Sequence, residues 1–250
     1  MKAILVRVAS DRSARGGKWN GPADPATRDF VYVPIPEPKG TRFHHGCRRE
    51  YDEVAPALQA FASQHGVDGQ RGVTLPERLV GRAMHLDPDF KALTYGNRPN
   101  PRGDRIQELQ RGDVIAFFGG LRSIRPKDKR LVYALIGLYV VDERVKARDV
   151  SATRRNENAH TRTIKAVGDD IVVRAQDTGG KSGRLKQYIP IGEYRDRAYR
   201  VRRDLLEEWG GLCVKNGYIQ RSANPPFLCD GGRFYKWFLR QNVPLVKRNN

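Results

Sequence analysis

The sequence predicts an α+β fold in which a β-barrel, or a strongly curved and mainly antiparallel sheet, carries helices on its outside. Two apolar runs rich in Val, Ile, Phe and Tyr, residues 114–118 and 131–141, predict the two central strands. Shorter strand-like runs and segments with helical spacing of apolar residues surround this pair. A chain of 250 residues can bury one substantial core, so we expect a single domain over residues 1–250.

The central pair is bounded by turn-forming residues. Gly112 and Asp113 provide a turn before the first run, and Gly119 and Gly120 let the backbone break away after it. This strand, glycine-rich exit and return strand resemble the small β-barrels of the PUA-like class, which includes the ASCH and EVE domains. Such barrels commonly grip a nucleotide or a modified base. A purely structural hairpin of a mostly-β domain is the alternative.

The remaining elements follow from local patterns, taken in chain order. Strands are predicted at residues 2–8, 30–36, 170–174 and 189–192. The prolines at positions 34 and 36 cannot donate to a ladder, so the second of these is expected at a sheet edge. Helices are predicted at residues 51–65, 194–209 and 233–240, the first two ending at glycines. In the last helix Phe234, Trp237 and Phe238 form one packing face.

The net charge of +18 and the pI of about 10.2 are the most informative features of the composition. Solubility alone does not require so large a charge at this length. Arginine outnumbers lysine, which favours bidentate contacts with phosphate and stacking on bases. Nucleic acid is therefore the expected partner.

Several classes of protein are disfavoured by what the sequence lacks. No apolar run is long enough to span a bilayer and the first residues are too short for a signal peptide, so we expect a cytoplasmic protein without membrane contact. The motifs GxxxxGK[ST], GxSxG and HExxH are absent. Cys47, Cys213 and Cys229 show no CxxC spacing, and His44, His45 and Cys47 have no further pair nearby. No cofactor, disulfide framework or metal site is predicted.

The segment HLDPD carries the strongest candidates for chemistry. His85, Asp87 and Asp89 could form a general acid/base or metal-assisted site, or could be a helix cap around Pro88. His160, in the polar segment NAHTR, is a further candidate with the same two interpretations. Our catalytic candidates are thus His85, Asp87, Asp89 and His160.

Aromatic and amide side chains near these segments predict a base-binding site. Trp19 and Asn20 follow a glycine-rich basic loop, where they could stack on a base and read its edge. Tyr32 and Tyr95 are the other stacking candidates, and Asn97 is a second amide. The alternative for Trp19 is that it fills one end of the core.

Basic loops beside the central hairpin predict the contacts with phosphate. The candidates are Arg98, Arg102, Arg105, Arg122, Arg125, Lys127, Arg197 and Arg200. A merely solvated basic surface is the alternative, above all for the two in segment 194–209.

Several short blocks in order resemble one known family. WNGP, VYVPIPE, HLDPDF, LTYG, RGDVIAFFGGLR, LVYALIGLY, NAHTR and IPIGEYRDRAYRVRRDLLEEWGG are similar to the nucleotide-modification-associated domain family of the third type. The resemblance implies a link to systems that hypermodify DNA bases, with DNA favoured over RNA and base-modification enzymes as possible partners. It implies no established reaction.

These observations lead to three functional hypotheses. The favoured one is a DNA-binding protein that holds a flipped-out or modified base beside the central hairpin. The second is an enzyme that acts on a nucleobase or nucleotide precursor through His and Asp acid/base residues. The third is an RNA-binding PUA-like module, which would prefer ligands that carry 2′-hydroxyl groups.

Overall fold

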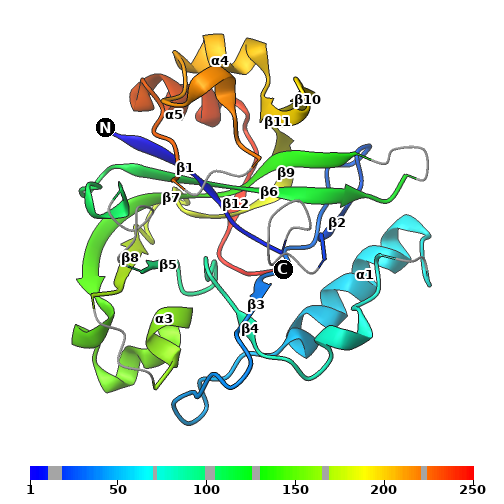
Figure 1. Ribbon diagram of the computed structural model, residues 1–250, viewed down its shortest axis with the longest axis vertical. Coiled ribbons are helices and arrows are strands. Elements are labelled where there is room, and N and C mark those ends of the chain that lie inside the picture. The colour runs from blue at the N-terminus through cyan, green and yellow to red at the C-terminus, as the bar shows by residue number, and fades with distance from the viewer. Residues whose placement is uncertain (11–18, 70–71, 99–104, 126–129, 165–168, 221–223) are drawn as a thin grey trace.

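A computed structural model describes residues 1–10, 19–69, 72–98, 105–125, 130–164, 169–220 and 224–250 (Figure 1). The strands are β1 (Ala3–Arg7), β2 (Pro22–Ala23), β3 (Ile35–Pro36), β4 (Met84–His85), β5 (Thr94–Asn97), β6 (Val114–Ser123), β7 (Leu131–Lys146), β8 (Ile171–Ala175), β9 (Gly183–Pro190), β10 (Gly192–Arg195), β11 (Ala198–Val201) and β12 (Leu245–Val246). The helices include α1 (Ala55–His65), α3 (Ala159–Arg162), α4 (Arg203–Trp209) and α5 (Gly231–Arg240). Short 3-10 helices are η1 (Tyr51–Val54), η2 (Glu77–Leu79), η3 (Ala147–Asp149), η4 (Ala152–Glu157) and η5 (Lys215–Gly217).

The predicted central hairpin is confirmed as β6 and β7. They pair antiparallel from Val114 opposite Val140 to Arg122 opposite Leu131, with one bulge at Phe117 and Phe118. β7 is long enough to pair with β9 along its first half and with β8 along its second half. β1 and β2 join the other edge of β6 in parallel orientation.

The main sheet is open. Its strand order is β1-β6-β7-β8-β5, with β2, β9 and β12 attached beside this path. Among the strands that the structure describes, none joins β1 to β5, so the sheet does not close into a barrel. The expectation of an α+β fold with a curved, mainly antiparallel sheet is confirmed, and its barrel alternative is not realised.

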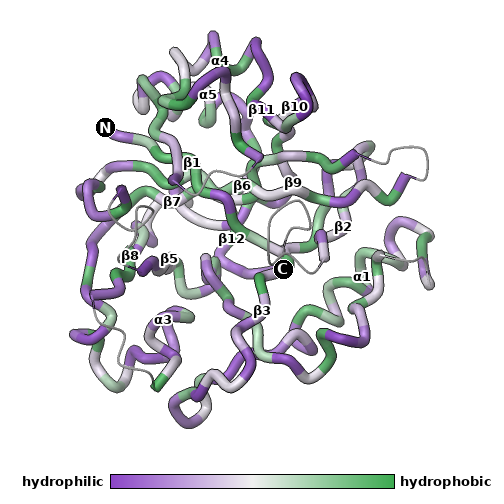
Figure 2. The backbone as a smooth tube through the Cα atoms, viewed as in Figure 1, coloured by the Kyte–Doolittle hydropathy of each residue, from purple (hydrophilic) through white to green (hydrophobic). Residues whose placement is uncertain are grey.

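Helices cover both faces of this sheet, so both faces are buried. Alternate residues of β6 face opposite ways: Val114 and Phe118 pack with α4 and α5, whereas Ile115 and Phe117 pack on the other side. α1, α3 and the β3–β4 pair lie on that second side (Figure 1). Hydrophilic segments concentrate at the periphery of the molecule (Figure 2).

Two predicted helices are confirmed: residues 51–65 form η1 and α1, and α5 begins two residues before the predicted 233. α1 follows η1, and Gly66 ends it in the left-handed conformation at φ 63°. α5 begins after Asp230, whose side chain accepts a hydrogen bond from the Arg233 N–H. Phe234 and Trp237 of α5 are buried against Trp209, as the packing-face prediction requires.

The predicted helix over residues 194–209 is wrong in its first half. There the chain forms the β10–β11 hairpin, in which Gly192 lies opposite Val201. Asp196 and Arg197 both have positive φ, 51° and 59°, as the tight turn of a two-residue hairpin requires. Tyr199 stacks on Tyr133 of β7 at 4.1 Å between ring centroids, and this packing stabilises the strand over the helix.

No helix described by the structure has the length and apolarity to cross a membrane.

Two cysteines that lie far apart in the sequence come together at the surface. The sulfur atoms of Cys213 and Cys229 are 3.2 Å apart, because Leu212 and Leu228 form a β-bridge beside them. A disulfide requires the sulfurs to approach by only about 1 Å.

We therefore expect oxidised glutathione to join Cys213 and Cys229 and to reduce the number of free thiols from three to one, leaving the buried Cys47. Closing a loop of this length adds about 3 kcal/mol to the free energy of unfolding. Thiol titration and urea unfolding before and after oxidation measure both effects. In the Cys213→Ser variant the stabilisation must disappear; if it persists, another pairing is responsible.

Candidate functional site

The candidate site lies on the face of the sheet opposite α4 and α5, where the β3–β4 pair, β5 and α3 meet (Figure 1). β5 pairs with β8 and contacts α3, so segments distant in sequence converge here.

His85 ends β4 and is held by a buried carboxylate. β4 pairs antiparallel with β3, and Glu37, which follows β3, places Oε1 2.8 Å from His85 Nδ1. Since a carboxylate only accepts, Nδ1 carries the proton and Nε2 is left for other partners. Burial disfavours the charged imidazole, but the Glu37 hydrogen bond and the charges of Asp87 and Glu37 outweigh it and raise the pKa of His85. The His85 side chain is 19% exposed, so this part of the site reaches the surface.

His160 is held in the same way by a second carboxylate. Asn158 caps α3 by accepting a hydrogen bond from the His160 N–H at 2.9 Å. Asp170, directly before β8, places Oδ2 2.6 Å from His160 Nδ1. Both residues are buried. This contact fixes the ring so that Nε2 faces Asp87, 3.9 Å from its Oδ2.

Asp87 lies between the two imidazoles. Its Oδ1 accepts hydrogen bonds from the Gly96 N–H at 2.7 Å and from Asn158 Nδ2 at 2.9 Å. Burial raises the pKa of Asp87 above its usual value, although the charges of His160 and His85 and these hydrogen bonds oppose the shift. Oδ2 is the oxygen that faces His160.

Together His85, Asp87 and His160 form one cluster. Each offers one nitrogen or oxygen atom, and these atoms all lie within 4.8 Å of one another. The two rings meet edge to face at 5.1 Å between centroids. Two imidazoles and a carboxylate at this separation can exchange protons with a substrate or share a cation.

Gly96 makes this close approach possible. A Cβ atom at Gly96 would lie 2.2 Å from His160 Cδ2 and 2.4 Å from Asn158 Oδ1. Any residue with a side chain at position 96 would therefore push α3 away from Asp87.

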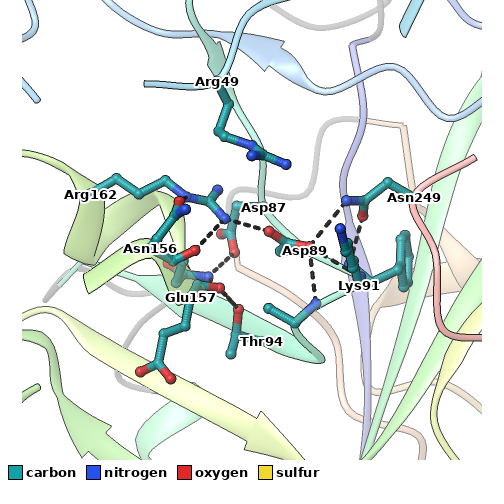
Figure 3. A network of polar contacts seen from close by, with 12 residues as sticks. Arg49, Asp87, Asp89, Lys91, Thr94, Asn156, Glu157, Arg162 and Asn249 are labelled. Carbon is teal, nitrogen blue, oxygen red and sulfur yellow. Dashed lines mark hydrogen bonds and ion pairs between the residues drawn. The ribbon is translucent and has the colours of Figure 1, made fainter. Parts of the chain in front are cut away.

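Asp89 organises a separate polar network beside the cluster (Figure 3). Its Oδ2 pairs with Arg162 Nη2 at 2.5 Å, and its Oδ1 accepts from Asn249 and from the backbone of Lys91 and Ala92, each at 3.1 Å. Figure 3 shows Asp89 between Arg162 on one side and Asn249 on the other. Both oxygens of Asp89 are thus occupied by protein donors, which hold the segment that carries Asp87.

Three arginines lie on segments next to the cluster. Arg82 Nη2 donates to the Glu37 carbonyl at 3.0 Å, Arg49 pairs with Glu53, and Arg98 follows β5. Arg98 is exposed and its charge acts on His85. Among the described residues, Arg49 Nε and Arg162 Nη1 are buried without a hydrogen-bond partner. Arg49 extends toward the Asp89 network in Figure 3.

The predicted base-binding residues separate into two groups. Tyr95 and Asn97 flank Gly96 on β5, and Asn97 Nδ2 donates to the Tyr95 hydroxyl at 3.1 Å. Tyr32 is also near the site, since its hydroxyl donates to the Pro88 carbonyl at 3.1 Å. All three are buried. Their role in binding a base stays a prediction.

Trp19 and Asn20 form the other group, beside β6. Asn20 Nδ2 donates to the Gly120 carbonyl at 2.7 Å, and Trp19 is 4% exposed within the core that includes Phe117. They do not join the contacts described for the His85–Asp87–His160 cluster.

Of the predicted phosphate contacts on the loops, Arg98 lies at the cluster. Arg102 and Lys127 lie outside the described residues. Arg105 donates to the Pro225 carbonyl, and Arg125 forms a two-pronged ion pair with Asp24.

The other three predicted phosphate contacts belong to strands and their turns. Arg122 is a half-buried residue of β6. Arg197 is exposed on the β10–β11 turn, and Arg200 donates to the carbonyl of Lys215. Their roles stay predictions.

Glu37, Asp170, Asn158 and Gly96 are site residues that the sequence alone did not single out for these roles. Glu37 directly follows β3 and Asp170 directly precedes β8, and carboxylates are common at such positions. Nothing in the sequence links them with histidines 48 and 10 positions away. Glu37, Gly96 and Asn158 do lie in the VYVPIPE, LTYG and NAHTR blocks, but the blocks assign them none of these roles.

A second basic feature lies where the second half of β7 meets η3, η4 and β8. Arg144, Lys146, Arg154 and Arg174 line an open hollow of about 500 Å³. Arg174 and Arg154 pair with Glu157, and Lys146 pairs with Asp169. Carboxylates thus offset much of its positive charge.

Comparison with known proteins identifies a family. The family model described as nucleotide modification associated domain 3 matches residues 2–210, which include the whole His85–Asp87–His160 cluster. No curated protein matches the chain, and no solved structure does.

Proposed function

Because this chain belongs to the nucleotide modification associated domain 3 family, we propose that it binds nucleic acid in a base-modification system and acts on a nucleobase at the His85–Asp87–His160 cluster. The family supports the role in base modification. The observation that carries the proposed chemistry is the cluster, in which a buried carboxylate orients each of two histidines toward a third carboxylate.

The cluster suits proton transfer to and from a heterocycle. His85 and His160 would act as the acid and the base on neighbouring atoms of the reacting group, with Asp87 beside them. Glu37 and Asp170 act through the histidines, because their oxygens contact Nδ1 and not the centre of the cluster. Such orienting partners fix both the tautomer and the ring direction.

The charge distribution suits a polyanionic substrate. The chain carries a net charge of +18, Arg82 donates to the Glu37 carbonyl behind His85, and the charge of Arg98 acts on His85. A base within a duplex must leave the stack to reach a half-buried site, at a cost of a few kcal/mol that phosphate contacts and stacking offset. DNA is the favoured substrate, because the family's association is with systems that modify DNA bases.

A protein that binds a modified base without changing it is the second candidate. The buried, mutually bonded Tyr95 and Asn97 next to the cluster favour it, because they could complete a base-reading pocket without chemistry. In that case His85 and His160 would hydrogen-bond the base edge.

Binding to matched single- and double-stranded DNA and RNA across a salt series tests the proposal. We expect the logarithm of the affinity to fall linearly with the logarithm of the salt concentration. Incubation with DNA followed by nucleoside mass spectrometry separates the enzyme from the binder. Absence of binding even at low salt would overturn both candidates.

The position of Arg98 provides a sharper prediction. Arg98→Ala should weaken DNA binding at every sequence and lower the salt slope by about 1, because one phosphate contact is lost. Arg240→Ala is the matched control, since Arg240 is exposed on α5 on the opposite side of the sheet and pairs with Glu208. Equal losses in the two variants would show that the DNA does not lie over the cluster.

A further inference from the structure

We propose that His85, Asp87 and His160 bind a divalent first-row transition metal ion. Their ligand atoms lie within 4.8 Å of one another. Such ions bind imidazole nitrogen and carboxylate oxygen at about 2.0–2.2 Å, so donors around one ion are about 3–4 Å apart. The three side chains need to close by roughly 1 Å, which small side-chain rotations provide.

The residues behind the histidines support this assignment independently. Metal-binding histidines almost always donate their second N–H to a carboxylate, a carbonyl or water. Here Glu37 contacts Nδ1 of His85 at 2.8 Å, and Asp170 contacts Nδ1 of His160 at 2.6 Å. Both histidines are therefore held with Nε2 as the ligand atom.

Asp87 is set up as a ligand through one oxygen. The Gly96 N–H and Asn158 Nδ2 occupy Oδ1, and Oδ2 faces His160 Nε2 at 3.9 Å. These hydrogen bonds orient the carboxylate before any ion arrives. Orientation of all three ligands by neighbouring groups is the feature that separates a built site from a chance cluster.

The local charge also favours a cation. The carboxylates of Glu37, Asp87 and Asp170 are each at most 6% exposed, and each has an imidazole nitrogen within 4 Å. Buried carboxylates are costly unless a positive charge compensates them. A divalent ion between the three ligands compensates that charge at the centre of the group.

The donor set narrows the class of ion. Two nitrogens and one oxygen fit Fe²⁺, Co²⁺ or Zn²⁺, whereas Mg²⁺ and Ca²⁺ prefer oxygen alone. Three protein ligands leave coordination positions open, as catalytic sites require. His85, at 19% exposure, marks the side from which another molecule can reach those positions.

An ion bound to Nε2 of both histidines takes those atoms from proton transfer, so with the ion present they act as ligands and not as acid and base. Metal binding itself requires no substrate, so it is tested without nucleic acid. Untagged protein is stripped with a chelator, dialysed and titrated calorimetrically with Zn²⁺, with Co²⁺, with Fe²⁺ under anaerobic conditions, and with Mg²⁺. We expect one transition metal ion per chain and no heat with Mg²⁺. No binding of any transition metal ion would overturn the proposal.

Variants locate the ion. We expect His160→Ala to lose at least about 100-fold in affinity and Asp170→Asn, which changes only the supporting contact, to lose about 10- to 100-fold. His45→Ala is the matched control, because His45 is an exposed histidine with no part in the cluster. Equal affinity in His160→Ala and His45→Ala would overturn the assignment.

A measurement on the unaltered protein tests the same ligands even if a variant fails to fold. Proton NMR of the Co²⁺ form should show two exchangeable, strongly shifted imidazole N–H signals, one from Nδ1 of each histidine. Fewer than two such signals would overturn the ligand set, whatever the variants show.

Discussion

Asp89→Ala is expected to lower the free energy of unfolding by about 3–5 kcal/mol, because it removes one partner of a buried ion pair and strands the other. The Asp89 and Arg162 side chains are 4% and 3% exposed, and their contact is 2.5 Å. Arg162 would keep the hydrogen bonds from Nε and Nη2 to Asn156, but these acceptors are neutral and do not balance its charge. Urea unfolding measures the loss.

The control for this prediction is the exposed pair between Arg240 and Glu208. Its side chains are 60% and 42% exposed, so Glu208→Ala should change stability by about 1 kcal/mol or less. Asp89→Asn tests the role of charge, since asparagine retains an oxygen for the backbone amides of Lys91 and Ala92. Losses of similar size in Asp89→Ala and Glu208→Ala would contradict the buried-pair argument.

Gly96→Ala is expected to have the second large effect, on the cluster itself. The new methyl group would lie 2.2 Å from His160 Cδ2 and 2.4 Å from Asn158 Oδ1, closer than atoms can approach. α3 must move away, at a cost of about 1–3 kcal/mol in stability. The same movement separates His160 from Asp87, so we expect metal affinity and DNA binding at the site to fall with it.

Gly232→Ala is the matched control for the glycine substitution. A Cβ there meets only Asp230 Oδ1, at 3.5 Å, and alanine is favoured over glycine in a helix by up to about 1 kcal/mol. This variant should be as stable as the unaltered protein or more so. Unfolding curves and NMR spectra of the imidazoles compare the two variants. A Gly96→Ala protein with unchanged His160 signals would refute the close-approach argument.

Sequence patterns predicted the elements whose stability is local. A stretch of a few residues was enough to recognise each of three features: the apolar runs of β6 and β7, the glycine after α1 and the aromatic face of α5. The local pattern gave a wrong prediction for residues 194–209, because the positions of Tyr199 and Val201 are compatible with a strand as well as with a helix. Stacking of Tyr199 on Tyr133 decides that ambiguity, and this contact spans 66 positions of the chain.

The candidate site was only partly visible in the sequence. His85 and Asp87 stand out because the HLDPD segment crowds them together, and His160 stands out within NAHTR. That these three residues meet in space was not predictable, because the spacing of residues in the sequence indicates only which side chains share a face of one helix or strand. Glu37 and Asp170 were missed for the same reason.

By itself the sequence determined the central hairpin, the strong positive charge and membership of a nucleotide modification associated family. Only the tertiary structure decided that two histidines and a carboxylate meet. That meeting depends on the β5–β8 register, which sets Gly96 opposite Val172, and on the absence of a side chain at Gly96. Register arises from pairing and packing across the whole sheet, so no local stretch of residues contains it.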